Sequence, residues 1–183
     1  MRWWLRQAQW DARRLVFLDE TSLNTQMVRR YGRAPADARC LDRVPHGHWH
    51  TATFLAALRH DRLNAPLLID GPLDGDLFLA WVEQGLGPTL QPGDLVCCDN
   101  LACHKVAGVR AALAARGAEL LYLPAYSPDF NPIELAFAKL KAALRAAAAR
   151  SWDELLAALA TALPAFTPEH CANFFRHAQY ATT

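Results

Sequence analysis

The segment Leu15-Val16-Phe17-Leu18-Asp19 sets a pattern that Leu95-Val96-Cys97-Cys98-Asp99 repeats: four apolar residues followed directly by an aspartate. Short apolar runs between polar residues are typical of strands that are buried on both faces. Parallel neighbouring strands bring their ends to one edge of a sheet, where α/β folds bind ligands. We therefore expect Asp19 and Asp99 to end two such strands and to meet at that edge. The alternative for each aspartate is that it begins a turn or caps the next element.

The rest of the chain predicts one domain with a mixed central sheet and helices on its faces. Residues 49–58 and 65–69 are typical of two strands joined by a turn, which predicts an antiparallel hairpin, and residues 119–123 of one more short strand. Helices are expected after Asp74, from Val106 to Gly117, from Pro132 to about Arg150, after the Ser151–Glu154 capping box, and after Thr167-Pro168.

Composition limits the class of protein. The 52% hydrophobic and 20% charged content is that of a globular chain, and the net charge of +1 does not by itself indicate a polyanionic partner. Eleven of the 19 basic residues, all of them Arg, lie within residues 1–62. The five cysteines have no CxxC spacing, which favours reduced thiols and a cytoplasmic location. The sequence has neither a signal-peptide pattern nor an apolar run long enough to span a membrane.

A third acidic residue, Glu134, lies in the block Ser127-Pro128-Asp129-Phe130-Asn131-Pro132-Ile133-Glu134. Asn131 before Pro132 predicts the start of a helix, and Glu134 then occupies the position of a capping-box acid. Capping is therefore the alternative to a functional role. Three converging carboxylates repel each other unless cations neutralise them, and carboxylates select hard ions such as Mg²⁺ or Mn²⁺. Two such ions are the usual apparatus for attack on a phosphodiester.

The three acidic segments together resemble a known enzyme family. Asp19-Glu20-Thr21, Asp99-Asn100 with His104-Lys105, and the block ending in Glu134 look like the three catalytic blocks of DDE transposases. The similarity is to the mariner superfamily, in its bacterial insertion-sequence branch (IS six-thirty), which the 34 residues between Asp99 and Glu134 suit. It extends from about Leu15 to the C-terminus.

This resemblance implies an α/β, RNase H-like fold of the retroviral-integrase type over residues 15–183. It implies an enzyme that cuts transposon-end DNA and joins it to target DNA. Asp19, Asp99 and Glu134 would be both the catalytic residues and the ligands of two Mg²⁺ or Mn²⁺ ions. Active complexes would contain a homodimer, and the enzyme would act on DNA near the nucleoid.

Candidate DNA contacts are basic residues near these blocks: Arg29, Arg30, Arg33, His104, Lys105, Lys141 and Arg145. Arginines beside Tyr31 suit contact with phosphates, and Lys141 and Arg145 continue the helical face of Glu134. The alternative for each is a solvated surface. His46, His48 and His50 alternate, but they lack a nearby ligand partner, so an exposed ribbon is favoured over a metal site.

The resemblance departs from the family at the N-terminus. Family members carry helix-turn-helix domains there, whereas here residues 1–14 are expected to be a linker remnant and the first acidic strand follows at once. The helix-turn-helix function could belong to a separate product. Two alternatives therefore remain: a truncated transposase that regulates or partners a full-length one, and another RNase H-like nuclease. The absence of Walker, GxGxxG and GxSxG motifs argues against nucleotide-binding and serine-hydrolase functions.

Overall fold

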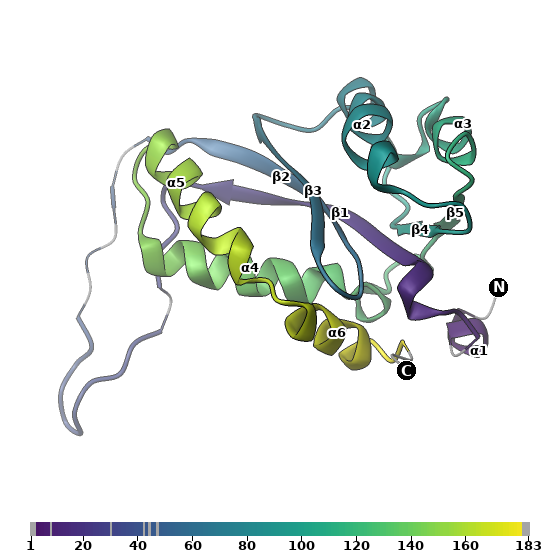
Figure 1. Cartoon of the computed structure of the whole chain (residues 1–183). Helices are drawn as coiled ribbons and strands as arrows, with labels where there is room; N and C mark the ends of the chain where they lie inside the picture. Colours follow the sequence, from purple (N-terminus) through teal and green to yellow (C-terminus); the bar gives the residue numbers. More distant parts are fainter. Residues whose placement is uncertain are drawn as a thin grey trace.

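The computed structural model describes residues 3–7, 9–29, 31–41, 43, 45–46 and 48–180. Its centre is strand β1 (Leu15–Asn24), which pairs antiparallel with β2 (Thr51–Leu58) and parallel with β4 (Leu95–Cys98). Strand β3 (Leu63–Asp70) flanks β2, and β5 (Glu119–Tyr122) flanks β4. The five-stranded sheet therefore has the order β3-β2-β1-β4-β5, which confirms the expected mixed sheet and hairpin (Figure 1).

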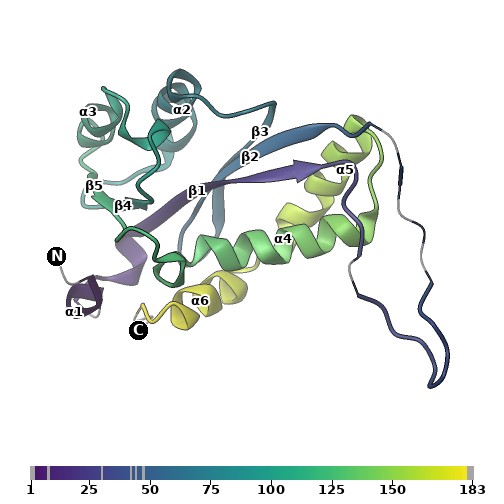
Figure 2. The same cartoon turned by 180° about the vertical axis from the view of Figure 1, so that it is seen from behind.

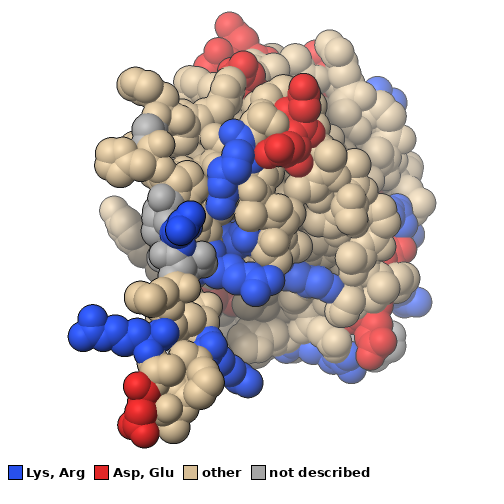
Figure 3. Space-filling view, turned by 90° about the vertical axis from the view of Figure 1, so that its left-hand side faces the viewer, with Lys and Arg blue, Asp and Glu red and all other residues tan. Residues whose placement is uncertain are grey.

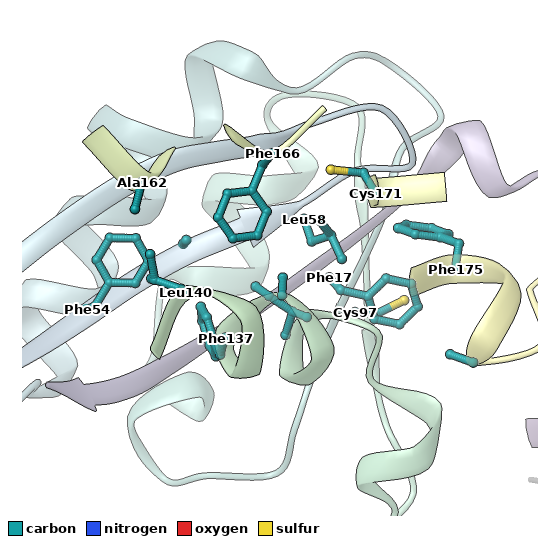
Figure 4. Packing of buried hydrophobic residues seen from close by; sticks show 14 of the residues in the cluster. Phe17, Phe54, Leu58, Cys97, Phe137, Leu140, Ala162, Phe166, Cys171 and Phe175 are labelled. Carbon is teal, nitrogen blue, oxygen red and sulfur yellow. The ribbon is translucent and has the colours of Figure 1, made fainter. Parts of the chain in front are cut away.

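Helices cover both faces of this sheet (Figures 1 and 2). Helices α2 (Gly75–Trp81) and α3 (Val109–Ala114) lie on one face, against Val16 and Leu18. Helices α4 (Ile133–Ala147), α5 (Trp152–Ala162) and α6 (Pro168–His177) lie on the other. That face buries an aromatic cluster around Phe17 (Figure 4). The shorter helical turns are Ala12–Arg14, Val82–Leu86, Gly87–Thr89, Cys103–Lys105, Pro128–Phe130 and Leu163–Ala165.

Asp19 does not end its strand as expected. β1 continues to Asn24 because β2 pairs with it along its whole second half, with Asp19 opposite Ala56. The shorter β4 pairs only with Leu15–Phe17. Asp19 therefore lies just past the last residue of β1 that β4 covers, and it still faces the edge where Asp99 follows β4.

The start of α4 also differs from the prediction. Pro132 precedes the first helical residue, and no side chain caps the helix. The side chain of Asn131 bonds to Asp19 instead, at 2.8 Å. By contrast, Ser151 and Thr167 cap α5 and α6 as the sequence indicates. A cap requires only local geometry, and Asn131 is diverted because a tertiary partner competes for the same side chain.

The N-terminal segment is packed against the C-terminal end. Helix α1 (Trp3–Gln7) buries Trp3, whose indole N–H donates to the Tyr180 hydroxyl at 2.9 Å. Tyr180 in turn donates to the carbonyl of Phe130 at 2.8 Å, and Gln7 donates to the carbonyl of Ala178. Residues 3–7 are thus attached to the turn that precedes α4.

The loop of residues 25–50 projects from the far end of β1 (Figure 1). Its described residues are mostly exposed and contain no helix or strand. His46, His48 and His50 precede β2, so they do not share a strand face, and His50 contacts Asp70 at 2.5 Å. No helix within the described ranges is long and apolar enough to cross a membrane.

Candidate active site

The three carboxylates predicted from the sequence line one cavity of about 380 Å³. Asp19 comes from β1, Asp99 follows β4, and Glu134 lies in the first turn of α4. Further lining residues are Asn100, Leu101, Asn131 and the segment Leu123–Pro128. The fold therefore brings together acidic residues that lie up to 115 positions apart in the chain.

Asp19 is the most enclosed of the three, with 7% of its surface exposed. One of its oxygens accepts the amide N–H of Glu20 at 2.9 Å, and the other accepts an amide N–H of Asn131 at 2.8 Å. Burial and the charge of Glu20 raise the pKa of Asp19 to about 7, against a lowering by the Glu20 amide; the charges of Glu134 and Asp99 raise it further. Neighbouring negative charges thus oppose ionisation of Asp19.

Asp99 has a more open position, because its side chain is 38% exposed. Its Oδ1 accepts the amide N–H of Leu101 at 2.9 Å and faces the His104 ring at 2.7 Å. Within the described part of the chain, both of these bonds reach Oδ1. Among the described residues, no hydrogen bond reaches the second oxygen, Oδ2.

Glu134 is exposed and does not cap α4. The capping alternative is therefore wrong for this residue, because Asn131, its expected partner in a capping box, bonds to Asp19. Glu134 remains available to the cavity, and its place in the first helical turn suits a negative charge.

The prediction that His104 contacts DNA is wrong. Its side chain is 0% exposed, enclosed between Asp99 and Glu20. Burial lowers the pKa of His104, whereas interactions with Cys98 and Glu20 raise it, and the result is a pKa of about 11. The short turn Cys103–Lys105 directs His104 inward and leaves the next residue, Lys105, exposed.

Of the other candidate DNA contacts, Arg30 falls outside the described residues. Arg29 and Arg33 are exposed on the projecting loop, and Lys105 lies over the ring of Tyr122. Lys141 and Arg145 are partly buried on α4. Arg145 joins Arg29, Arg43 and Arg150 around a hollow of about 260 Å³, on the face where Figure 3 shows basic side chains gathered between loop and body.

The donor atoms of the cavity suit a hard divalent cation. Asp19, Asp99 and Glu134 offer only oxygen, and their mutual repulsion is the kind that a cation relieves. Asn131 supports the same fit, since its buried Oδ1 is without a hydrogen-bond partner among the described residues. The residues that would hold such an ion are therefore the three carboxylates, and the side-chain oxygen Oδ1 of Asn131 is a further oxygen donor of the cavity lining.

The sequence does not predict the roles of Asn131 and Glu20 at and beside this cavity. The pattern at Asn131 indicates a helix cap, and that at Glu20 indicates no role of its own. The alternation of side chains along β1 could have predicted which side of the sheet Glu20 faces. Phe17 and Asp19 face α4, whereas Leu18 and Glu20 face the α2 side. No sequence pattern predicts that Asn131 donates to Asp19, because the two residues meet only in the folded chain.

A family model described as DDE superfamily endonuclease matches residues 14–156. The chain belongs to this family. No curated protein sequence matches it. Among solved structures, Mos1 transposase in a paired-end complex with the left transposon end is 17% identical with a TM-score of 0.72. The match covers 91% of this chain and 52% of that one, so this DDE-family chain spans about half the length of its neighbour.

The catalytic domain of Mos1 mariner transposase alone is 15% identical with a TM-score of 0.65, over 92% of this chain and 79% of that domain. These likenesses confirm the RNase H-like fold of this DDE-family chain.

Proposed function

We propose that this chain is the catalytic domain of a transposase that cleaves transposon-end DNA and joins it to target DNA. One observation carries the proposal: in a DDE-family domain, Asp19, Asp99 and Glu134 from three separate elements line one cavity. In this proposal the catalytic domain spans residues 15–183 and the three carboxylates hold two Mg²⁺ or Mn²⁺ ions. Such ions activate an attacking oxygen and stabilise a leaving oxygen.

The chain's own groups have distinct parts in this chemistry. The Asn131 amide orients the buried Asp19, and the Leu101 amide N–H orients Asp99. Glu134 approaches from the other side of the cavity on α4, so that the phosphodiester would lie between two strands and a helix. Water would be the nucleophile for cleavage and a 3′-hydroxyl for joining.

The solved neighbours support a DNA substrate and a divalent ion. Their titles name Mos1 transposase with a transposon end, in a strand transfer complex, and with Mn or Mg. By this analogy we propose DNA and a divalent ion as partners here. The resemblance in sequence adds a homodimer in the active complex and a separate helix-turn-helix product that recognises the ends. We also propose that the chain belongs to the bacterial insertion-sequence branch, which the 34 residues between Asp99 and Glu134 suit. Arg29, Arg33, Lys105, Lys141 and Arg145 are proposed to contact the DNA backbone.

The test is cleavage of supercoiled plasmid and of transposon-end duplexes in Mg²⁺, comparing the parent chain with Asp99→Asn. Asp153→Asn, an exposed carboxylate change on α5, is the matched control. We expect cleavage by the parent and the control and its loss in Asp99→Asn. Equal rates for the parent and Asp99→Asn, with equal melting temperatures, would show the assignment to be wrong.

Product analysis separates the proposal from its two alternatives. Covalent joining of the cut 3′ end to a target duplex supports a transposase, whereas hydrolysis without joining supports another RNase H-like nuclease. The regulator alternative predicts no cleavage by the folded chain and a changed rate when the chain is mixed with a full-length transposase.

A further inference from the structure

His104 is held rigidly beside the cavity without lining it. Its ring is fully enclosed and packs on Phe78 of α2, with ring centroids 4.6 Å apart and planes at 41°. Its backbone carbonyl accepts the Tyr122 hydroxyl at 3.2 Å. A ring fixed by an aromatic neighbour and by its own backbone has little freedom to turn.

Both ring nitrogens of His104 face carboxylates. Nδ1 lies 2.7 Å from Oδ1 of Asp99, and Nε2 lies 3.0 Å from Oε2 of Glu20. Both distances are those of hydrogen bonds, so the ring is held at its two nitrogens by two separate elements of the fold.

This arrangement links the two strands that carry the two aspartates. Glu20 adjoins Asp19 on β1 but faces the α2 side, and it does not line the cavity. His104 reaches from Glu20 on that side to Asp99 at the end of β4. Through His104, the position of the Asp99 side chain therefore depends on β1.

We propose that His104 is a positioning residue, which fixes the Asp99 carboxylate through Oδ1 so that Oδ2 is presented to the cation, while Glu20 sets the orientation of the ring. This proposal rests on the proposed function, in which Asp99 is a metal ligand. Partners that orient a metal ligand contribute 10–100-fold to metal affinity in other proteins.

Two amide variants separate the two contacts. In His104→Asn the amide nitrogen occupies the place of Nδ1 and still donates to Asp99, whereas in His104→Gln it reaches toward Glu20. Both variants lose the ring packing on Phe78, so each controls for the structural loss in the other. The measurement is calorimetric titration with Mn²⁺ alone, without DNA, together with the melting temperature of each chain.

We expect His104→Asn to bind Mn²⁺ nearly as tightly as the parent and His104→Gln to bind about 10–100-fold more weakly. Equal Mn²⁺ affinities in the two variants would reduce His104 to a structural role and overturn the proposal. Asp99→Asn, titrated in parallel, tests the proposed function by itself. If its Mn²⁺ affinity is unchanged, Asp99 is not a ligand; if it falls while the two His104 variants agree, only the role of His104 is refuted.

A second outcome would also overturn the proposal. Possible ligand atoms of Glu20, Cys103 and His104 lie within 4.8 Å of one another, and a thiolate with an imidazole suits softer ions such as Zn²⁺ or Co²⁺. A thiolate-to-cobalt absorption band that Cys103→Ser abolishes would make His104 a ligand of a different metal site. We expect no such band in the parent chain.

Discussion

Asp19 and Asp99 follow nearly identical apolar runs, yet the protein holds them in different ways. Asp19 is 7% exposed in the middle of β1, where an uncharged amide contacts it. The side chain of Asp99 is 38% exposed beyond the end of β4 and faces a buried histidine. One carboxylate is enclosed among like charges, and the other is open and attached to an opposite charge.

This difference assigns the two aspartates different energetic parts. Burial and repulsion make the ionised form of Asp19 unfavourable in the absence of a cation, so a divalent ion bound there would relieve this unfavourable free energy. Asp99 is less buried than Asp19, and its contribution to the site is the fixed position of its carboxylate. The two residues should therefore be alike in their effect on catalysis and unlike in their effect on stability.

The largest expected effect is on DNA cleavage. Asp19→Asn and Asp99→Asn should each lower the rate in Mg²⁺ by roughly 10³-fold, because a lost metal ligand forfeits several kcal/mol of transition-state stabilisation. Single-turnover cleavage of a transposon-end duplex measures this, with Asp153→Asn as control. Residual cleavage by only one of the two variants would mean that the aspartates are not equivalent ligands.

The pH dependence of stability should distinguish the two residues. The pKa of Asp19 is raised from 3.8 to about 7 on folding, so the unfolded chain loses this proton first. This group's contribution to stability is therefore greatest at acidic pH and declines between about pH 4 and pH 7, by on the order of 4 kcal/mol.

Urea unfolding in chelator at pH 4.5 and pH 7.5 measures that decline. Asp19→Asn should lack this part of the pH dependence and should be more stable than the parent at pH 7.5, and Mg²⁺ should restore much of the stability of the parent. A parent and an Asp19→Asn variant with the same slope between these pH values would contradict the burial argument.

Asn131 provides a smaller test of the enclosed carboxylate. Asn131→Ala removes the donor to Asp19 and should lower the free energy of unfolding by about 1–3 kcal/mol, the cost of leaving a buried polar group unpaired. Asn173→Ala, an exposed change on α6, is the control for losing an asparagine. A melting temperature equal to that of the control would remove Asn131 from the site.

The smallest effects concern DNA contacts outside the cavity. Lys105→Ala lies on the Asp99 side and Arg145→Ala on the helix of Glu134, and each should weaken DNA binding while reducing the magnitude of the salt slope by about 1. Arg62→Ala, exposed at the β2–β3 turn, is the control. Fluorescence anisotropy at several salt concentrations measures the slope, and a slope equal to the control's would show that the residue makes no phosphate contact.

Local patterns predicted most of the fold. The apolar runs before Asp19 and Asp99 indicated two buried neighbouring strands, and the Ser151 and Thr167 caps gave the starts of α5 and α6. The predictions were wrong where a partner distant in sequence determined the structure. β1 extends beyond its apolar residues because β2 pairs with its polar half, and Asn131 bonds to Asp19 instead of capping α4.

The sequence by itself determined that three acidic residues would be brought to one site, because two strand patterns and one eight-residue block encode it locally. Only the tertiary structure decided how each acid is held: Asp19 by Asn131, and Asp99 by a buried His104 that also contacts Glu20. The Asn131–Asp19 and His104–Glu20 contacts join residues more than 80 positions apart, and no local pattern predicts them. For this reason His104, which lies next to Lys105 in a segment typical of the surface, is buried in the folded protein.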